Sequence, residues 1–446
     1  MLRLALLATA IAVACPAYAD ADLDALRAEL NTLKSAYETR IQALEARFQA
    51  TETQVTKVTP AKHAAPPSAP EAAASNRFNP EISLIMQGRY ATLKSQSESP
   101  TTGFMSSGKI EAPTRGFSVD DSELVISANI DPYFRGYFNA VLKDDAVGVE
   151  EAWVQTLALG NGLTLKGGRF RSGIGYQNAQ HPHAWDFATN SLMGDTLFGE
   201  GYGNDGLQLK WVAPTELFTE LGAEIGRGAN FPGSDRNQNG IGSYALFGHL
   251  GGDVGVSHSW RGGVSYLSTR AQSRSGSLTD FNGSVVNTRF SGDTKTWLAD
   301  FVWKWAPQGN ATQTNLKLSA ELFRREESGN MNCDDGLCGS GSLGAYRTIQ
   351  TGAYAQGVYQ FMPRWRTGYR YDLLDPGSLN YGANNSNLAR SDYRPTRHSL
   401  MVDYSPSEFS RLRLQYTKDQ SRVEQNDNQW VVQYIHSLGA HGAHAF

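Results

Sequence analysis

The chain has few charged residues, few cysteines and no marked excess of charge of either sign. Of its 446 residues only three are Cys and 19% are charged, and 40 Lys+Arg against 44 Asp+Glu give a net charge of −4. A balance this close to neutral argues against a nucleic-acid-binding protein. Beyond the first residues there is no long apolar run either, so no helix of the mature chain is expected to span a bilayer.

Glycine and aromatic residues are abundant instead. The chain contains 45 Gly and 11% aromatic residues, and its mean hydropathy of −0.41 is too polar for a bundle of membrane helices. This composition favours short alternating strands, either in a soluble β-protein or in an outer-membrane barrel.

Residues 1–19 have the pattern of a secretory signal peptide. Arg3 precedes an apolar stretch, and Ala17-x-Ala19 forms a small-residue cleavage site. We therefore expect cleavage after residue 19. A lipoprotein signal at Cys15 is the alternative, but a proline directly after this cysteine argues against it.

The next two segments differ in spacing and composition. Residues 20–55 carry apolar positions at heptad spacing with one stutter, which predicts a periplasmic coiled coil that assembles a trimer; a single solvated helix is the alternative. These positions are Leu23, Leu26, Leu30, Leu33, Tyr37, Ile41, Leu44 and Phe48. Residues 56–76 are rich in Ala and Pro and are predicted to form an extended linker.

From residue 77 to 446 the apolar spacing changes to a period of two. We predict an all-β domain here, a transmembrane antiparallel up-and-down β-barrel of about sixteen strands. The connections alternate between short turns and long polar loops, which places both termini at the short-turn, periplasmic rim. The predicted long loops are residues 93–116, 171–204, 227–241, 269–295, 326–345 and 375–396.

Charged and aromatic side chains separate onto opposite faces of several candidate strands. Trp297 and Phe301, for example, alternate with Asp300 and Lys304. Because a charge at the bilayer midplane costs about 2–4 kcal/mol, charged faces should line a polar, wet lumen. The basic residues assigned to the lumen are Lys304, Arg364, Arg366, Arg370, Arg411 and Arg413.

A soluble sandwich or propeller would also alternate, but it would bury its apolar face and would not need aromatic residues near the strand ends. The C-terminal Phe446, which can close the last strand as outer-membrane barrels commonly do, also favours the membrane barrel.

Cys333 and Cys338 are the cysteines that remain after processing, in a stretch rich in Gly, Ser and Asp. In an exported chain we expect them to form a disulfide that closes a loop. A metal site with Asp334 and Asp335 is the alternative, but no second Cys/His pair follows nearby in the sequence.

The segment Gly168-Arg169-Phe170-Arg171-Ser172-Gly173-Ile174-Gly175 is similar to the end of strand five in the phosphate-selective porin O and P family. The order of signal peptide, coiled coil, linker and barrel also resembles these trimeric bacterial porins. The resemblance implies a homotrimer in outer-membrane lipid that passes small hydrophilic solutes or ions, with anions as candidates. It also implies that the loop at 171–204 folds into the lumen as a constriction.

The predicted constriction loop departs from this family in its charge. Phosphate-selecting relatives carry clustered Arg and Lys there, whereas this loop has Arg171 at its start, followed by His181, His183 and Asp186. Anion selectivity would then have to come from the arginines of the wall.

The same His181, His183 and Asp186, together with three histidines near the C-terminus, resemble a group of proteobacterial outer-membrane proteins described as zinc-regulated receptors. The C-terminal histidines are His436, His441 and His444. Imidazoles with a carboxylate suit Zn²⁺, so one hypothesis is a metal site and the other is loop packing around Trp185. A TonB-dependent receptor is not expected, because the roughly sixty residues between the signal peptide and the first strand are too few for a plug domain.

Four functions are compatible with these patterns. A passive channel without enzymatic activity is the preferred one, and metal-linked uptake or binding is the second. An enzyme is disfavoured, because neighbours such as His398 and Ser399 would point to opposite faces of a strand. A structural anchor with a lumen filled by side chains is the fourth.

Overall fold

The computed structural model describes residues 80–94, 101–105, 114–143, 146–199, 201–339, 342–423 and 425–439. The predicted signal peptide, coiled coil and linker at 1–19, 20–55 and 56–76 lie outside these residues, as does Phe446.

Strands make up most of the described chain. They are β1 (Glu81–Thr92), β2 (Gly116–Val119), β3 (Ser122–Asn129), β4 (Phe134–Lys143), β5 (Ala146–Thr156), β6 (Leu163–Arg171), β7 (Gly203–Val212), β8 (Phe218–Gly226), β9 (Ser243–Val254), β10 (His258–Thr279), β11 (Val285–Trp305), β12 (Asn315–Cys333), β13 (Ser342–Met362), β14 (Trp365–Asn380), β15 (Thr396–Ser407), β16 (Ser410–Arg422) and β17 (Gln425–Gly439). The described helices are α3 (Leu192–Phe198) and the 3-10 turns η2 (Pro182–Ala184), η3 (Pro307–Gly309), η4 (Gly336–Cys338) and η5 (Gly382–Ser386).

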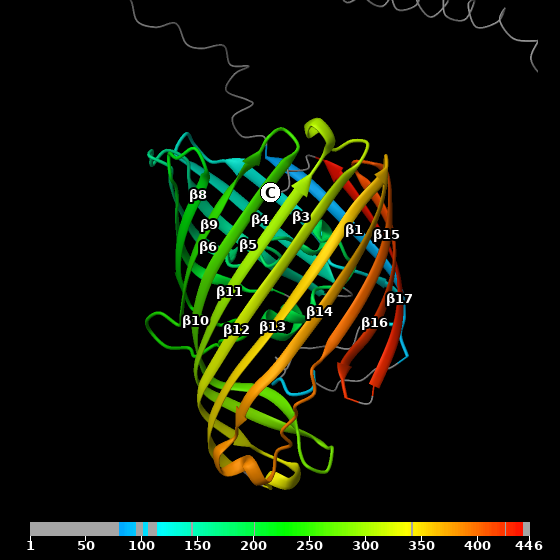
Figure 1. Ribbon diagram of the computed structural model, residues 1–446. Helices are drawn as coiled ribbons and strands as arrows, with labels where there is room; N and C mark the ends of the chain where they lie inside the picture. Colours follow the sequence, from blue (N-terminus) through cyan, green and yellow to red (C-terminus); the bar gives the residue numbers. More distant parts are fainter. Residues whose placement is uncertain are drawn as a thin grey trace, which may run out of the picture. The chain divides into compact units, whose positions relative to one another are not determined.

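These strands close into an antiparallel barrel (Figure 1). From β3 onward each strand pairs with the next along the chain, and β17 returns to pair with β1. Both β2 and β3 pair with β1, one after the other, so the seventeen segments occupy sixteen positions in the wall. The prediction of a sixteen-stranded up-and-down barrel is confirmed.

The outer face of the wall is apolar and exposed. Aromatic pairs lie on it toward both ends of the strands: Trp365 with Tyr404 near the short-turn rim, and Tyr416 with Trp430 toward the other rim. Other exposed residues of this face include Leu221, Leu246, Val264, Trp297, Phe301, Leu400 and Leu438. Soluble monomers rarely expose such a continuous apolar belt, which is the surface that faces lipid in a transmembrane barrel.

Among the described residues, no helix has both the length and the hydropathy needed to cross a membrane.

The strands from β10 to β14 extend past the others at the long-loop rim, where Figure 1 shows them converging. The predicted loops at 269–295 and 326–345 are therefore wrong: β10 continues to Thr279, β11 begins at Val285, and β12 continues to Cys333. The extensions enclose an apolar cluster that includes Phe290 and Met331. In this part of the structure Cys333 is joined to Cys338 by a disulfide.

We predict that Leu414→Arg lowers the free energy of unfolding in lipid vesicles by about 2–4 kcal/mol. Leu414 lies on the outer face of β16 between the exposed Val402 and Val432, so the guanidinium would enter hydrocarbon. Urea titration of the protein folded in vesicles measures this cost. Leu343→Arg, at an equally apolar exposed position on the extension of β13, is the matched control and should unfold close to wild type. Equal costs at both positions would contradict a lipid belt around Leu414.

Candidate functional site

Residues 172–199 and 201–202, called the inner loop from here on, lie between β6 and β7 inside the barrel. They include η2 and α3, and Figure 1 shows this segment behind the front strands of the wall. The segment predicted at 171–204 as a constriction therefore has the right place for that role.

The half of the inner loop around α3 packs in an apolar cluster. Leu192, Met193, Leu197 and Phe198 of α3 are all buried against the inner face of β9 to β14. The wall contributes Ala245, Phe247, Leu267, Leu298, Phe323, Tyr354 and Leu374. This part of the interior is apolar, where the prediction was a polar, wet lumen. An alternating strand can carry an apolar residue inward wherever another segment covers it.

Polar groups of the wall hold the remainder of the inner loop. On β8, Glu224 accepts a hydrogen bond from the Ser172 hydroxyl at 2.6 Å. On β16, the side-chain oxygen of Gln415 accepts one from the Ala188 amide at 2.7 Å. Because these contacts come from separate parts of the wall, the loop is fixed on several sides.

Two of the predicted lumen arginines also hold the loop. Arg370 and Arg413 are almost fully buried on the inner face. Arg370 donates to the Asn190 carbonyl oxygen at 2.7 Å, and Arg413 donates to the Trp185 carbonyl oxygen at 2.9 Å. Their donors satisfy loop carbonyl groups, and solvent does not reach them.

The other predicted lumen residues have different surroundings. Arg366 and Arg411 lie on the inner face and keep 22% and 25% of their side chains exposed, and Lys304 has the same orientation by register with Asp300. The prediction for Arg364 is wrong. This residue is exposed in the turn between β13 and β14 with a φ of 71°, because the chain reverses there and the alternation begins again at Trp365.

Asp186 lies apart from the two histidines, so the predicted ligand set of His181, His183 and Asp186 is wrong in its carboxylate. Asp186 is buried against β12 and β14, where its oxygens lie 2.7 Å from Lys317 Nζ and 3.4 Å from Arg366 Nη1. Burial alone would raise the pKa of Asp186, but the charges of Lys317 and Arg366 lower that pKa well below its usual range.

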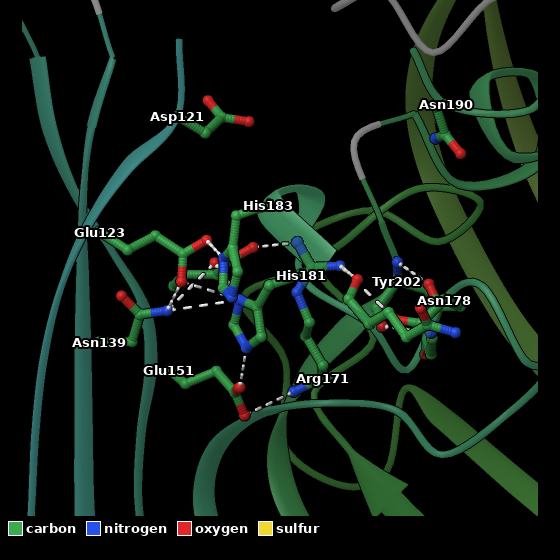
Figure 2. Close-up of polar contacts among 12 residues, drawn as sticks. Asp121, Glu123, Asn139, Glu151, Arg171, Asn178, His181, His183, Asn190 and Tyr202 are labelled. Atoms are coloured by element: carbon green, nitrogen blue, oxygen red, sulfur yellow. Dashed lines mark hydrogen bonds and ion pairs between the residues drawn. The ribbon is translucent and has the colours of Figure 1, made fainter. Parts of the chain in front are cut away.

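The histidines instead face three glutamates of β3 and β5. Figure 2 shows two of them, Glu123 and Glu151, beside the histidines. Nδ1 of His181 lies 3.0 Å from Glu150 Oε2 and 3.3 Å from Glu123 Oε2, and its Nε2 lies 2.9 Å from Glu151 Oε1. Nδ1 of His183 lies 2.8 Å from Glu123 Oε1. Burial would lower the pKa of His181, but hydrogen bonds with Glu150 and Glu151 raise it to about 10.

Arg171, at the end of β6, completes this cluster. Its guanidinium pairs with Glu150 through Oε1, the carboxylate oxygen that does not face His181. It also reaches the carbonyl oxygen of Gln180 at 3.4 Å, so one arginine joins the wall to the start of the inner loop.

Two adjacent glutamates face inward because β5 contains a β-bulge. The register with β4 shifts between Asn139 and Ala140, which leaves Glu150 without a partner. A bulge interrupts the alternation of faces, so the side chains of both Glu150 and Glu151 reach the inner loop. Sequence reasoning missed these two residues and Glu123. The acidic pair itself could have predicted the bulge, because a regular strand would turn one of the two carboxylates toward lipid.

No known protein-family profile matches the chain. A protein of Aquifex aeolicus described as uncharacterized is 29% identical over 348 residues, covering 74% of this chain and 70% of the relative.

Two solved structures share the barrel. One is OmpTdeltaL8, a loop L8 deletion mutant of the Vibrio cholerae outer membrane protein OmpT, with a TM-score of 0.51, 12% identity and coverage of 81% of this chain and 99% of that one. The other is the outer membrane channel DcaP of Acinetobacter baumannii, with a TM-score of 0.51, 13% identity and coverage of 81% and 97%. At such identities the likeness establishes the fold.

We predict that Asp186→Asn lowers the free energy of unfolding by about 3–5 kcal/mol, because it leaves the partly buried charges of Lys317 and Arg366 without this partner. Urea unfolding of the protein in detergent micelles measures the change. The control is Asp293→Asn, which breaks an exposed pair with Arg270 and should cost about 0.2–1 kcal/mol. If Asp186→Asn unfolds like the control, Asp186 does not anchor the inner loop.

Proposed function

We propose that this chain is an outer-membrane, porin-like channel through which small hydrophilic solutes or ions diffuse passively. The observation that carries the proposal is a closed barrel with an apolar exposed face, a largely polar inner face and a loop that narrows its interior. A wall of this kind separates lipid from water and selects solutes by width and charge. The fold shared with DcaP, described as an outer membrane channel, adds support.

Partly exposed charged groups on the inner side mark where water enters. Lys210 and Arg411 are partly exposed toward the short-turn rim, and Glu150 and His181 are partly exposed beside the inner loop. The side of β9 to β14 is filled around α3, and polar contacts also hold the loop to β3, β5, β8 and β16, so the passage would be narrowest where it passes the inner loop. The loop would then act as its constriction.

Positive charge outnumbers negative charge in one part of this passage. Arg366, Arg411 and Arg413 surround Asp403. Asp186 also pairs with Arg366 and with Lys317, so four basic side chains face two carboxylates here. Nη1 of Arg411 is buried and has no hydrogen-bond partner among the residues that the structure describes. We therefore infer a preference for anions, which arises from Arg366 and Arg411 on the wall.

The wall histidines do not suit a hydrolase. His398 lies 2.7 Å from the Tyr369 hydroxyl on the outer face, whereas the hydroxyl of Ser399 lies 3.2 Å from that of Thr417 on the inner face. A nucleophile and its base have to meet within hydrogen-bond distance, which this strand prevents. Assembly as a trimer remains a prediction from the heptad spacing of residues 20–55.

We predict that the purified full-length protein conducts ions in stepwise fashion in a planar lipid bilayer. In a KCl gradient the reversal potential should have the sign of an anion preference. Failure to conduct in several salts would contradict the channel, whereas a cation preference would contradict the inference about anions and leave the channel standing.

The double variant Arg366→Gln, Arg411→Gln should move the reversal potential toward zero, because it removes two positive charges beside the passage. The matched control is Arg270→Gln on the exposed extension of β10, which should leave the potential unchanged. Equal reversal potentials in the double variant and the wild type would show that these two arginines do not set selectivity.

A further inference from the structure

We propose that Glu123, Glu150 and His181 bind a divalent first-row transition-metal ion where the inner loop meets β3 and β5. Glu123 Oε2, Glu150 Oε2 and His181 Nδ1 converge here, and one potential ligand atom from each residue lies within 4.8 Å of the other two. Ligands around one ion have this spacing. The inference goes beyond the channel and does not depend on whether the barrel conducts.

Both ring nitrogens of His181 face carboxylates, and in the proposed metal-bound form Nε2 carries the proton. Its Nε2 lies 2.9 Å from Glu151 Oε1. Glu151 is itself held in place, because its other oxygen accepts hydrogen bonds from Trp153 Nε1 at 3.0 Å and from the Arg171 amide at 3.1 Å. A metal-binding histidine normally donates its second ring N–H to such a carboxylate, which directs the bare nitrogen at the ion. Here that nitrogen is Nδ1.

Each of the two carboxylate ligands is held in the same way. Oε1 of Glu123 lies 2.8 Å from His183 Nδ1, and Oε1 of Glu150 pairs with Arg171. In both glutamates this leaves Oε2 directed at His181. The arrangement is that of ligands with an outer layer of hydrogen-bond partners, which orient them before an ion arrives.

These three atoms cannot all be bare acceptors at such short separations. Carboxylate oxygens and a bare imidazole nitrogen all accept hydrogen bonds, so their separations of 3.0 and 3.3 Å require a proton or a metal ion between them. The protonated histidine is the competing occupant, and the experiment below has to separate the two.

Asn139 is the second observation that points to a metal ion. Its side chain is fully buried, and its Nδ2 faces all three proposed ligand atoms, at 2.8 Å from Glu123 Oε2, 3.4 Å from His181 Nδ1 and 3.5 Å from Glu150 Oε2. Its Oδ1 is buried and has no hydrogen-bond partner among the described residues, a costly state for a polar atom. A half-turn of the amide directs Oδ1 at the same centre, where it becomes a fourth ligand. The resulting set of oxygen and imidazole donors suits Zn²⁺ and Mn²⁺ rather than soft ions.

The test is equilibrium dialysis of the refolded full-length protein against Zn²⁺. His441 and His444 are replaced by Ala in every sample, because terminal histidines could bind zinc independently. A single tightly bound Zn²⁺ ion is expected, and it should be lost in His181→Ala and in Glu150→Gln. His398→Ala, which removes a wall histidine outside the cluster, should bind like the parent. Circular dichroism and the heat-dependent shift in gel mobility verify that each barrel is folded.

Two further variants separate metal binding from a purely structural role. Glu151→Gln should weaken Zn²⁺ affinity about 10–100-fold, because it removes the orienting partner of His181. Asn139→Asp should strengthen the affinity by adding a charged ligand, a gain that misfolding cannot produce. A parent protein without tightly bound Zn²⁺, or His181→Ala binding like the parent, would overturn the proposal and leave a protonated histidine at this position. None of these measurements uses conductance, so a failed channel and a failed metal site are distinguishable.

Discussion

The structure depends on one constraint, the closure of the wall. Unpaired backbone groups are too costly in hydrocarbon, so the strands of a transmembrane barrel pair without an open edge. Here β17 pairs with β1 and completes the circle. In a closed sheet each strand turns alternate side chains to the interior, so closure gathers the charged residues inside while Leu414 and its neighbours remain exposed outside.

Charged groups that closure brings inside have to find partners, and the inner loop supplies many of them. Arg370 and Arg413 bind loop carbonyl groups, while Glu224 and Gln415 accept hydrogen bonds from loop donors. Loop and wall are therefore one hydrogen-bonded unit, and much of the wall charge is already compensated. A solute would meet the charges that remain partly exposed, above all Arg366 and Arg411.

The sequence was sufficient for the wall, because alternation repeats in every strand and tolerates errors at the strand ends. It was insufficient where a turn or a bulge interrupts the alternation. The turn before Trp365 removes Arg364 from the lumen, and the bulge at Glu150 turns two adjacent glutamates inward. The long extensions of β10 and β11 were also missed, because they are rich in Ser and Thr and their register shifts after Ala271. Their burial comes from neighbouring strands that the local sequence does not reveal.

The inner loop also explains why His181, His183 and Asp186 could not be assigned together. These residues are close in sequence, but the two parts of the barrel wall that they contact carry opposite charge. The glutamates of β3 and β5 attract the two histidines, while the lysine of β12 and the arginine of β14 attract Asp186. Over five residues the loop passes from an acidic part of the wall to a basic part. Its histidines contact the acidic part, and its aspartate contacts the basic part. The spacing of residues within the loop could not predict these contacts, because the contacting glutamates, lysine and arginine come from strands elsewhere in the sequence.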